Sequence, residues 1–390
     1  MRSKTLSLIA LVVASVVGVP WPSMAQQPIR VGASIAITGR DAIQGGYVRE
    51  GYLLCQKHVN EKGGVLGRPI EFLIRDDGSD PKTAVGLYEK LITEDTVNAV
   101  MGPYGSPITD AVADVTERHR KLMIAPAAAT TSIWEKGRRY LVMMLSPLEA
   151  SAEGTIDLAA RHGLKTIGLI GALARPAIIK GALELARKQG LEVVVHETFP
   201  AGTTDFSTML TKVKAAKPDV LVVGAPPADA IAITRQVREL DVNVTMYGAT
   251  PGGAFPDYYK GLGNMAEFVY AGSYWEPSLP YPGNQEFVAA YQQEFTRAPS
   301  FLSAASYAGC QLFVDAVKRA ESLDSDKLRE ALLKVKTQTV FGDFAVDDRG
   351  FQVAHKAVTI QWQDGKSAVV WPDAAATGKP RFPTPPWSQR

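Results

Sequence analysis

The sequence predicts an α/β fold made of two doubly wound, Rossmann-like lobes. Short apolar segments alternate with amphipathic helical segments along most of the 390 residues, and this alternation breaks once near residues 140–147 before it resumes. Strands that alternate with helices usually pair in parallel, so each half is expected to form a parallel sheet with helices on both faces. The composition, 46% hydrophobic and 21% charged, is sufficient for two cores.

The first residues have the pattern of an export signal. Arg2 and Lys4 precede an apolar run at residues 6–19, and Ser23 and Ala25 frame a small-x-small cleavage site. We therefore expect residues 1–25 to be a signal peptide that is cleaved after Ala25. No later apolar run is long enough to predict a membrane helix. The formal net charge of +2 gives no indication of nucleic-acid binding.

The first half contains a β-α-β-α-β run with clear boundaries. Residues 38–46 are polar and contain several glycines, which predicts a loop. Asp80 followed by proline predicts the start of a helix. Strands are expected at residues 29–37, 70–74, 97–101 and 121–126, with helices at 47–60, from 81 and from 107. Residues 140–147 (YLVMMLSP) interrupt the alternation of strands and helices, which predicts a segment that crosses to the other lobe.

The second half repeats the alternation and then changes character. Strands are expected at residues 166–170, 191–199, 219–224, 244–247 and 269–275, with helices at 152–162, 176–189, 206–216 and 228–240. Three further helices are expected at 285–296, 303–322 and 326–335, and a β-pair at 357–363 and 368–371. The tail after residue 373 is rich in proline and small residues, which predicts irregular structure.

Two turns between strands and helices carry the strongest indication of a binding site. Ser106 lies where a helix begins, and residues 127–131 (AAATT) follow the next strand with small side chains and hydroxyls. Free N–H groups at a helix start, together with the helix dipole, favour an anion. The sequence therefore predicts a cradle for a small carboxylate. The alternative is that Ser106 and Thr130 only cap helices.

Catalytic and metal-binding patterns are not found. The five histidines are scattered without metal-ligand spacing, and residues 76–80 (DDGSD) lack the register of a calcium loop. Ser106 lacks the glycines of a nucleophile elbow, because Tyr104 and Ile108 stand two residues to either side. No phosphate-loop or dinucleotide motif occurs. We therefore expect that the protein is not an enzyme and that it binds neither a cofactor nor a metal ion.

The two cysteines both lie in apolar helical patterns. Cys55 shares a stripe with Val48 and Tyr52, and Cys310 follows Tyr307. They are far apart in the sequence. Two buried free thiols are the favoured interpretation, although export would permit a disulfide.

Several stretches, taken in order, resemble one protein family. Residues 58–85 (HVNEKGGVLGRPIEFLIRDDGSDPKTAV) are the most specific, and MGPYGSP, IAPAAATT, AGTTDFSTMLTKVKAAKPDVLVVGA and FGDFAVDDRG follow in sequence order. The chain thereby resembles the type I periplasmic solute-binding proteins of branched-chain amino acid ABC transporters. The resemblance implies a location in the periplasm, a hinged two-lobe fold, a small-molecule ligand, membrane permease subunits as partners and a monomer.

The resemblance also implies a domain layout with three crossings between the lobes. The crossings would lie near Ser146, near Gly272 and at residues 343–348. The first lobe would comprise residues 26–146 and 273–345, and the second lobe residues 147–272 and 346–376. Residues 377–390 would form an irregular C-terminal tail. The ligand would lie in the cleft, at the carboxyl edges of the sheets.

The residues that would hold a ligand are implied by the same resemblance. Ser106, Ala128 and Thr130 match the positions that hold an α-carboxylate in family members that bind amino acids, and Thr131 is an alternative to Thr130. The acidic residue that receives the α-ammonium aligns with Thr250. Family aromatic positions align with Arg175-Pro176, Pro226 and Gln44. Arg175 is either an exposed loop residue, the favoured interpretation, or a second anion-binding group.

These differences predict a carboxylate ligand without an α-amine. An ammonium buried without a carboxylate loses roughly 1.5–3 kcal/mol of charge-assisted hydrogen bonding. Tyr104, with Trp134 or Tyr47, could line an apolar compartment in the binding site. Aromatic acids are therefore the first choice of ligand, and small aliphatic acids or amides are the second. The alternative interpretation of Tyr104 is that it packs in the core. Other functions kept open are binding of branched-chain amino acids, and ligand sensing for a membrane receptor. A hydrolase that uses Ser106 has no visible base.

Overall fold

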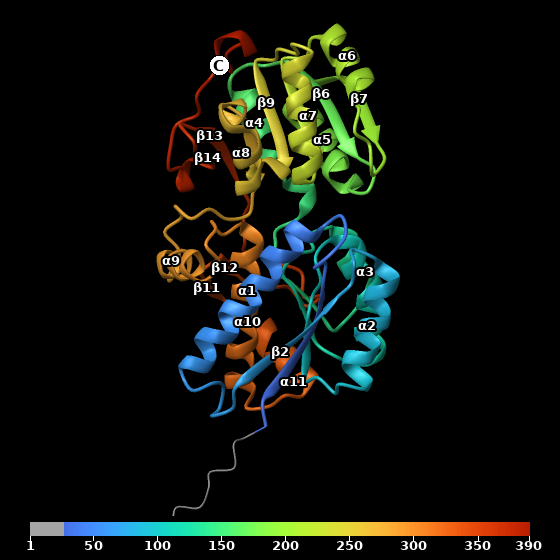
Figure 1. Cartoon of the computed structure of the whole chain (residues 1–390), viewed down its shortest axis with the longest axis vertical. Coiled ribbons are helices and arrows are strands. Elements are labelled where there is room, and N and C mark those ends of the chain that lie inside the picture. Colours follow the sequence, from blue (N-terminus) through green and yellow to red (C-terminus); the bar gives the residue numbers. More distant parts are fainter. Residues whose placement is uncertain (1–26) are drawn as a thin grey trace, which may run out of the picture.

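The computed structural model describes residues 27–390, so the predicted signal peptide lies outside the described residues. Two α/β lobes lie end to end along the long axis of the molecule (Figure 1). The sheet of the first lobe is parallel, and the sheet of the second lobe is parallel over five of its seven strands, with an antiparallel pair at one edge; this confirms the predicted fold class. Among residues 27–390, no helix has the length and apolar character needed to span a bilayer.

The first lobe has a five-stranded parallel sheet in the order β2-β1-β3-β4-β5. Figure 1 shows α1 and α10 on one side of this sheet, with α2 and α3 on the other. The strands are β1 (Ile29–Ile35), β2 (Ile70–Asp76), β3 (Ala99–Met101), β4 (Met123–Ala125) and β5 (Leu141–Met143). The helices are α1 (Ala42–Glu61), α2 (Pro81–Thr93), α3 (Ser106–Arg118), α9 (Asn284–Phe295), α10 (Phe301–Ala320) and α11 (Ser325–Leu333).

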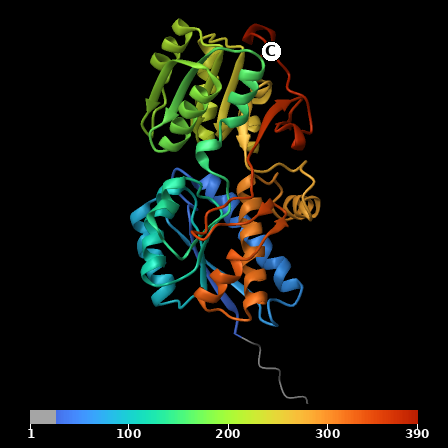
Figure 2. The same ribbon diagram turned by 180° about the vertical axis from the view of Figure 1, so that it is seen from behind.

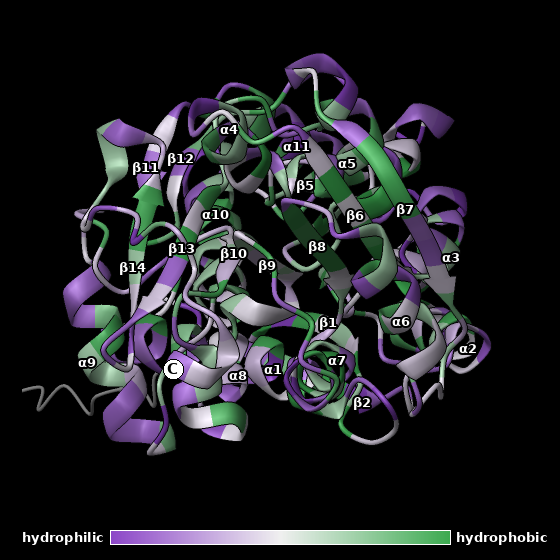
Figure 3. Cartoon of the chain, turned by 90° about the horizontal axis from the view of Figure 1, so that it is seen from above, coloured by the Kyte–Doolittle hydropathy of each residue, from purple (hydrophilic) through white to green (hydrophobic). Residues whose placement is uncertain are grey.

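The second lobe has a seven-stranded sheet in the order β14-β13-β10-β9-β8-β6-β7. The strands are β6 (Thr166–Ala172), β7 (Glu192–Phe199), β8 (Val220–Ala225), β9 (Met246–Pro251), β10 (Tyr270–Ser273), β13 (Val358–Gln363) and β14 (Lys366–Trp371). The helices are α4 (Glu153–Arg161), α5 (Pro176–Gln189), α6 (Ser207–Ala216), α7 (Pro227–Glu239) and α8 (Pro256–Leu262). In Figure 3 the inner strand β8 is hydrophobic over most of its length, as expected for a strand covered on both faces.

Short elements connect and extend the lobes. The hairpin of β11 (Thr337–Thr339) and β12 (Gly342–Phe344) lies in the first lobe, as the view from behind shows (Figure 2). Trp387, in the C-terminal tail, packs on the second lobe through an indole N–H that donates to the Val242 carbonyl at 2.9 Å. The 3-10 turns are Thr131–Lys136, Leu148–Ala150, Gly252–Ala254, Gly263–Ala266, Asp373–Ala375 and Trp387–Gln389.

Two predicted boundaries in the first lobe are corrected. Helix α1 begins at Ala42, inside the segment expected to be a loop, because Gly45 lets the helix approach the end of β1. A Cβ on Gly45 would lie 2.0 Å from the Ala36 carbonyl oxygen. Within the predicted crossing segment, Leu141–Met143 instead pair with β4 and form the edge strand β5. The chain leaves the first lobe after that strand.

The expectation of two free thiols is wrong. Cys55 and Cys310 form a disulfide that joins α1 to α10, with Cα atoms 6.2 Å apart. Both residues are at most 1% exposed, so the predicted burial is confirmed. The physical reason is tertiary: α1 and α10 pack against each other, which places the two residues at bonding distance although 255 positions separate them in the sequence.

The third connection between the lobes follows a long path along the first lobe. The Met143 amide donates to the Gly350 carbonyl at 2.8 Å, so residue 350 still lies against the first sheet. His355 then approaches the second crossing, with its Nε2 2.9 Å from the Tyr274 carbonyl oxygen. Strand β13 begins the second-lobe part at Val358. The predicted residue at which each lobe ends stays a prediction.

Candidate ligand-binding site

The two turns singled out in the sequence lie side by side. The Ser106 hydroxyl accepts hydrogen bonds from the amides of Ala129 and Thr130, at 3.2 and 3.3 Å. The Gly105 amide also donates to the Ala127 carbonyl at 3.0 Å. Gly105 precedes α3 with a φ of +90°, a conformation that glycine adopts without strain. Hydroxyl and amide groups of both turns therefore gather at one place at the edge of the first sheet.

A cavity of about 30 Å³ lies between this place and the second lobe. Its wall is mostly apolar and aromatic, and it includes residues from both lobes and from the segments that cross between them. The lining residues are Tyr104, Ser106, Ala127, Ala129, Leu145, Leu148, Arg175, Pro226, Pro227, Pro251, Phe255, Tyr274, Phe301 and Leu302. We call this space the interlobe cavity.

Arg175 is the one charged residue among those that line the interlobe cavity. It is the loop residue that immediately precedes α5, and it is partly buried rather than exposed as the sequence favoured. Its Nη2 donates to the Tyr104 hydroxyl at 2.9 Å, and its guanidinium carbon lies 5.5 Å from the Tyr104 ring centroid. Tyr104 belongs to the first lobe, so this contact joins the two lobes across the cavity.

The Tyr274 hydroxyl is a further polar group in the wall of the interlobe cavity. Within the part of the chain that the structure describes, it is buried and has no hydrogen-bond partner. Burial, reinforced by the Glu149 carboxylate, raises the pKa of the Tyr274 phenol. Burial likewise raises the pKa of Tyr104, although Arg175 opposes this. Both phenols are therefore neutral at pH 7, and Tyr274 can donate a hydrogen bond to a ligand oxygen.

Comparison with known proteins places this architecture in a family. A family model described as periplasmic binding protein matches residues 28–367, which is most of the chain. The chain belongs to the periplasmic binding proteins. Family members are solute-binding proteins of ABC transporters rather than enzymes, and the fold, with its two parallel-sheet lobes, is the type I fold of that family.

Curated relatives of this binding protein cover nearly all of its length. A "Leu/Ile/Val-binding protein homolog 7" of Brucella suis is 25% identical over 96% of this chain and 99% of the relative. A "Leucine-, isoleucine-, valine-, threonine-, and alanine-binding protein" of Pseudomonas aeruginosa is 25% identical over 84% of this chain and 88% of the relative.

Solved structures of similar proteins hold two kinds of ligand. The binding protein LivJ of Streptococcus pneumoniae, in complex with isoleucine, has a TM-score of 0.80 and is 25% identical, covering 87% of this chain and 97% of its own. A solute-binding protein of Rhodopseudomonas palustris, in complex with 3,4-dihydroxy benzoic acid, has a TM-score of 0.78 and is 26% identical, covering 87% and 95%.

The six predicted site residues of this binding protein differ in whether they line the interlobe cavity. Tyr104 and Ser106 line the interlobe cavity. Ala128 and Thr130 belong to the adjoining turn, where their neighbours Ala127 and Ala129 form the wall. Gln44 is buried in the first turn of α1 and does not line the cavity.

Thr250 lies at the end of β9 and faces away from the interlobe cavity. Its hydroxyl donates to the Ser151 carbonyl at 2.9 Å, and the residue is 1% exposed. The next residue, Pro251, lines the cavity in its place. No acidic side chain stands among the described lining residues. This wall therefore offers one cation and no anion.

Two aromatic residues named in the sequence lie outside the cavity wall. Trp134 is buried in the first-lobe core with its ring edge-on to Phe351. Tyr47 donates from its hydroxyl to Asp257 of the second lobe at 2.9 Å, so it forms a contact between the lobes.

Sequence reasoning missed Tyr274, Phe301 and Phe255, which supply the aromatic wall. Tyr274 follows β10 in the second crossing segment, and Phe301 is the first residue of α10. The Phe301 ring centroid lies 5.1 Å from that of Tyr274 and 4.9 Å from that of Phe255. An aromatic residue in a crossing segment was the one signal that could have indicated Tyr274.

Proposed function

We propose that this chain is the substrate-binding subunit of an ABC importer for a small carboxylate without an α-amine, with aromatic acids preferred. The observation that carries the proposal is the interlobe cavity wall, which combines Arg175 with apolar and aromatic side chains and contains no carboxylate. A buried ammonium would lack an ionic partner there, whereas a carboxylate would find a guanidinium.

Each end of an aromatic acid has a counterpart in the wall. The carboxylate would accept hydrogen bonds from Arg175 and from the Ser106 hydroxyl, while the ring would lie against Tyr274 and Phe301. Edge-to-face and stacked aromatic contacts contribute about 0.5–1.5 kcal/mol beyond the apolar area that they bury. The 26% identical relative whose structure holds 3,4-dihydroxy benzoic acid supports this preference.

Ligand entry would require the lobes to separate. A cavity of about 30 Å³ is smaller than any aromatic acid. The hydrogen bonds Tyr47–Asp257 and Arg175–Tyr104 join the lobes and would break on opening. Hinge closure around a ligand is a common motion of two-lobed binding proteins, and the closed form would be the one that permease subunits recognise.

Branched-chain amino acids remain the second candidate. The 25% identical LivJ structure with isoleucine, and the names of the curated relatives, favour them. Glu149 is the carboxylate next to the lining residue Leu148, but both of its oxygens already accept from Thr131, at 3.2 and 3.0 Å. An ammonium ligand would have to displace those bonds.

Calorimetric titration of the mature protein tests the proposed ligand class. Benzoate, 4-hydroxybenzoate and 3,4-dihydroxybenzoate are expected to bind, with leucine and isoleucine much weaker. Mass spectrometry of material that co-purifies with the protein gives an independent answer. Tight binding of leucine with no heat from any aromatic acid would refute the proposal.

Replacement of Arg175 by alanine is expected to weaken binding of the preferred acid roughly ten- to hundredfold. The reason is that a charge-assisted hydrogen bond contributes about 1.5–3 kcal/mol. The matched control is Arg187→Ala, which removes the same charge from the exposed last turn of α5. Equal affinity of the Arg175 variant and wild type would show that Arg175 does not contact the ligand.

A further inference from the structure

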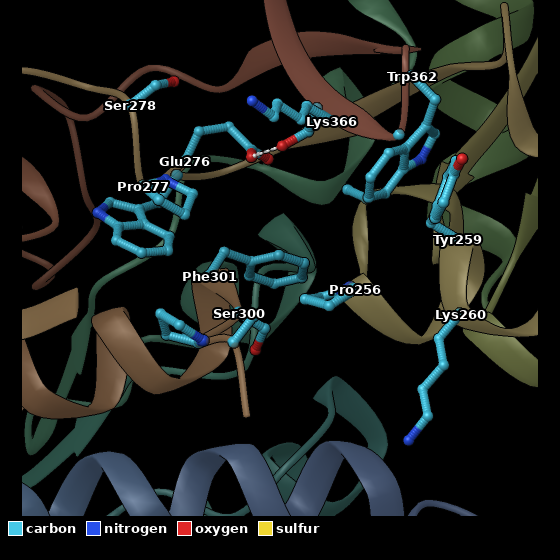
Figure 4. Close-up of a pocket in the computed structure, with 16 residues that line it drawn as sticks. Pro256, Tyr259, Lys260, Glu276, Pro277, Ser278, Ser300, Phe301, Trp362 and Lys366 are labelled. Carbon is cyan, nitrogen blue, oxygen red and sulfur yellow. Dashed lines mark hydrogen bonds between the residues drawn. The ribbon is translucent and has the colours of Figure 1, made fainter. Parts of the chain in front are cut away.

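A second and larger cavity, of about 440 Å³, lies beside the segment that follows β10 (Figure 4). Its walls come from residues 254–260 and 362–367 of the second lobe, residues 298–301 of the first lobe and the crossing residues 275–278. Phe301 is the one lining residue that it shares with the interlobe cavity. We call it the Glu276 cavity, because Glu276 is the one acidic residue among those that line it.

The Glu276 carboxylate is buried without a cationic partner. The residue is 4% exposed, and the Ser367 hydroxyl donates to its Oε2 at 2.6 Å, the hydrogen bond drawn in Figure 4. It forms no ion pair with any residue in the described part of the chain. Burial raises the pKa of this carboxyl to about 7, with the Ser367 and Ser273 hydroxyls opposing the rise. A buried carboxylate in this state gains stability from any cation that reaches it.

Aromatic rings stand across the cavity from this carboxylate. Figure 4 shows Trp362 and Tyr259 on the side opposite Glu276, with Phe301 below the space that separates them from Glu276. The Trp362 indole N–H donates to the Gly253 carbonyl at 2.7 Å, which fixes the ring, and the Tyr259 ring centroid lies 5.1 Å from that of Trp362. These faces suit an apolar body or the face of a cation.

We propose that the Glu276 cavity is a second ligand site, for a small primary amine with an apolar or aromatic body. The ammonium would lie against the Glu276 carboxylate and the body against Trp362 and Tyr259. Lys260 and Lys366 also line the cavity, but both are exposed, so solvent screens their charge more than that of the buried carboxylate.

Calorimetric titration with 2-phenylethylamine tests this site. Wild type is expected to bind the amine, and Glu276→Gln is expected to bind it about tenfold more weakly or worse, because a hydrogen-bonded ionic contact is lost. The matched control is Glu286→Gln, which removes an exposed carboxylate from α9 and should bind like wild type. No binding to wild type, or equal binding by the Glu276 variant, would overturn the proposal.

The pH dependence provides a second readout. Between pH 8 and pH 5.5 the Glu276 carboxyl, which shares the cavity with Lys260, Lys366 and Tyr259, takes up a proton, whereas the amine of the ligand stays charged. Affinity in wild type is therefore expected to fall on acidification, and Glu276→Gln should not show this fall. An affinity that rises toward low pH would contradict the site.

Two further variants keep the test decisive if Glu276→Gln unfolds. Ala298→Trp narrows the cavity at an exposed position without changing Glu276, and it should weaken amine binding. Lys366→Ala reports the sign of the ligand charge: it should leave amine binding unchanged or slightly tighter. Unchanged binding in Ala298→Trp, or weaker binding in Lys366→Ala, would show that the amine binds elsewhere. Thermal unfolding of each variant verifies its fold.

Discussion

Replacing both cysteines, Cys55→Ser with Cys310→Ser, is expected to lower the free energy of unfolding by about 5 kcal/mol. The disulfide connects residues that are 255 positions apart, so it restricts a very long loop in the unfolded chain. A chain-entropy estimate for such a loop gives about 5 kcal/mol, at the upper end of the usual range for disulfides. The bond also lies in the packed contact between α1 and α10, where both residues are at most 1% exposed.

Urea unfolding of the mature protein under oxidising conditions measures this effect. Wild type should unfold at a higher urea concentration than the double serine variant. Adding dithiothreitol to unfolding wild type should lower its midpoint toward that of the variant, and it should not change the variant itself. Identical midpoints for the two proteins, with or without reductant, would show that the bond does not form or does not stabilise the fold.

The same pair of residues shows what the sequence can and cannot predict. The apolar stripes around Cys55 and Cys310 correctly indicate two buried helix faces, because burial follows from local periodicity. The bond depends on the packing of α1 against α10, and those helices come from opposite ends of the chain. No local pattern records that packing.

The elements of the two sheets were predictable for a related reason. Runs of apolar residues that end in turn residues identify strands such as β8, and Asp80 identifies the start of α2, where its side chain accepts from the Thr83 amide at 2.7 Å. The start of α1 was not predicted because Gly45 is a poor helix former. The structure needs a glycine at this position because the helix passes close to the Ala36 carbonyl.

In the candidate site too, some features follow from local sequence and others depend on tertiary packing. The turn at Ser106 and the turn at residues 127–131 were recognisable as strand-to-helix connections, and the Ser106 hydrogen bonds show that they adjoin. Arg175 and Tyr274 reach the cavity only through the arrangement of the lobes. The direction of the Thr250 side chain depends on the Ser151 carbonyl in a crossing segment, which no sequence pattern locates.

Leucine is expected to bind roughly 100-fold more weakly than 4-methylpentanoate, which is leucine without its α-amine. Both have the same carboxylate and the same branched body, so the difference in affinity isolates the ammonium. In the interlobe cavity this ammonium meets Arg175 and no acidic side chain among the lining residues. The loss of its hydration without a charged partner, together with repulsion by a cation, costs about 3 kcal/mol, or about two powers of ten in affinity.

The measurement that tests the account most directly is therefore a paired calorimetric titration of the mature protein with leucine and 4-methylpentanoate at pH 7. The account predicts that 4-methylpentanoate binds about 100-fold more tightly than leucine. Equal affinities, or tighter binding of leucine, would contradict it, because a carboxylate such as Glu149 would then have to reach the ligand ammonium.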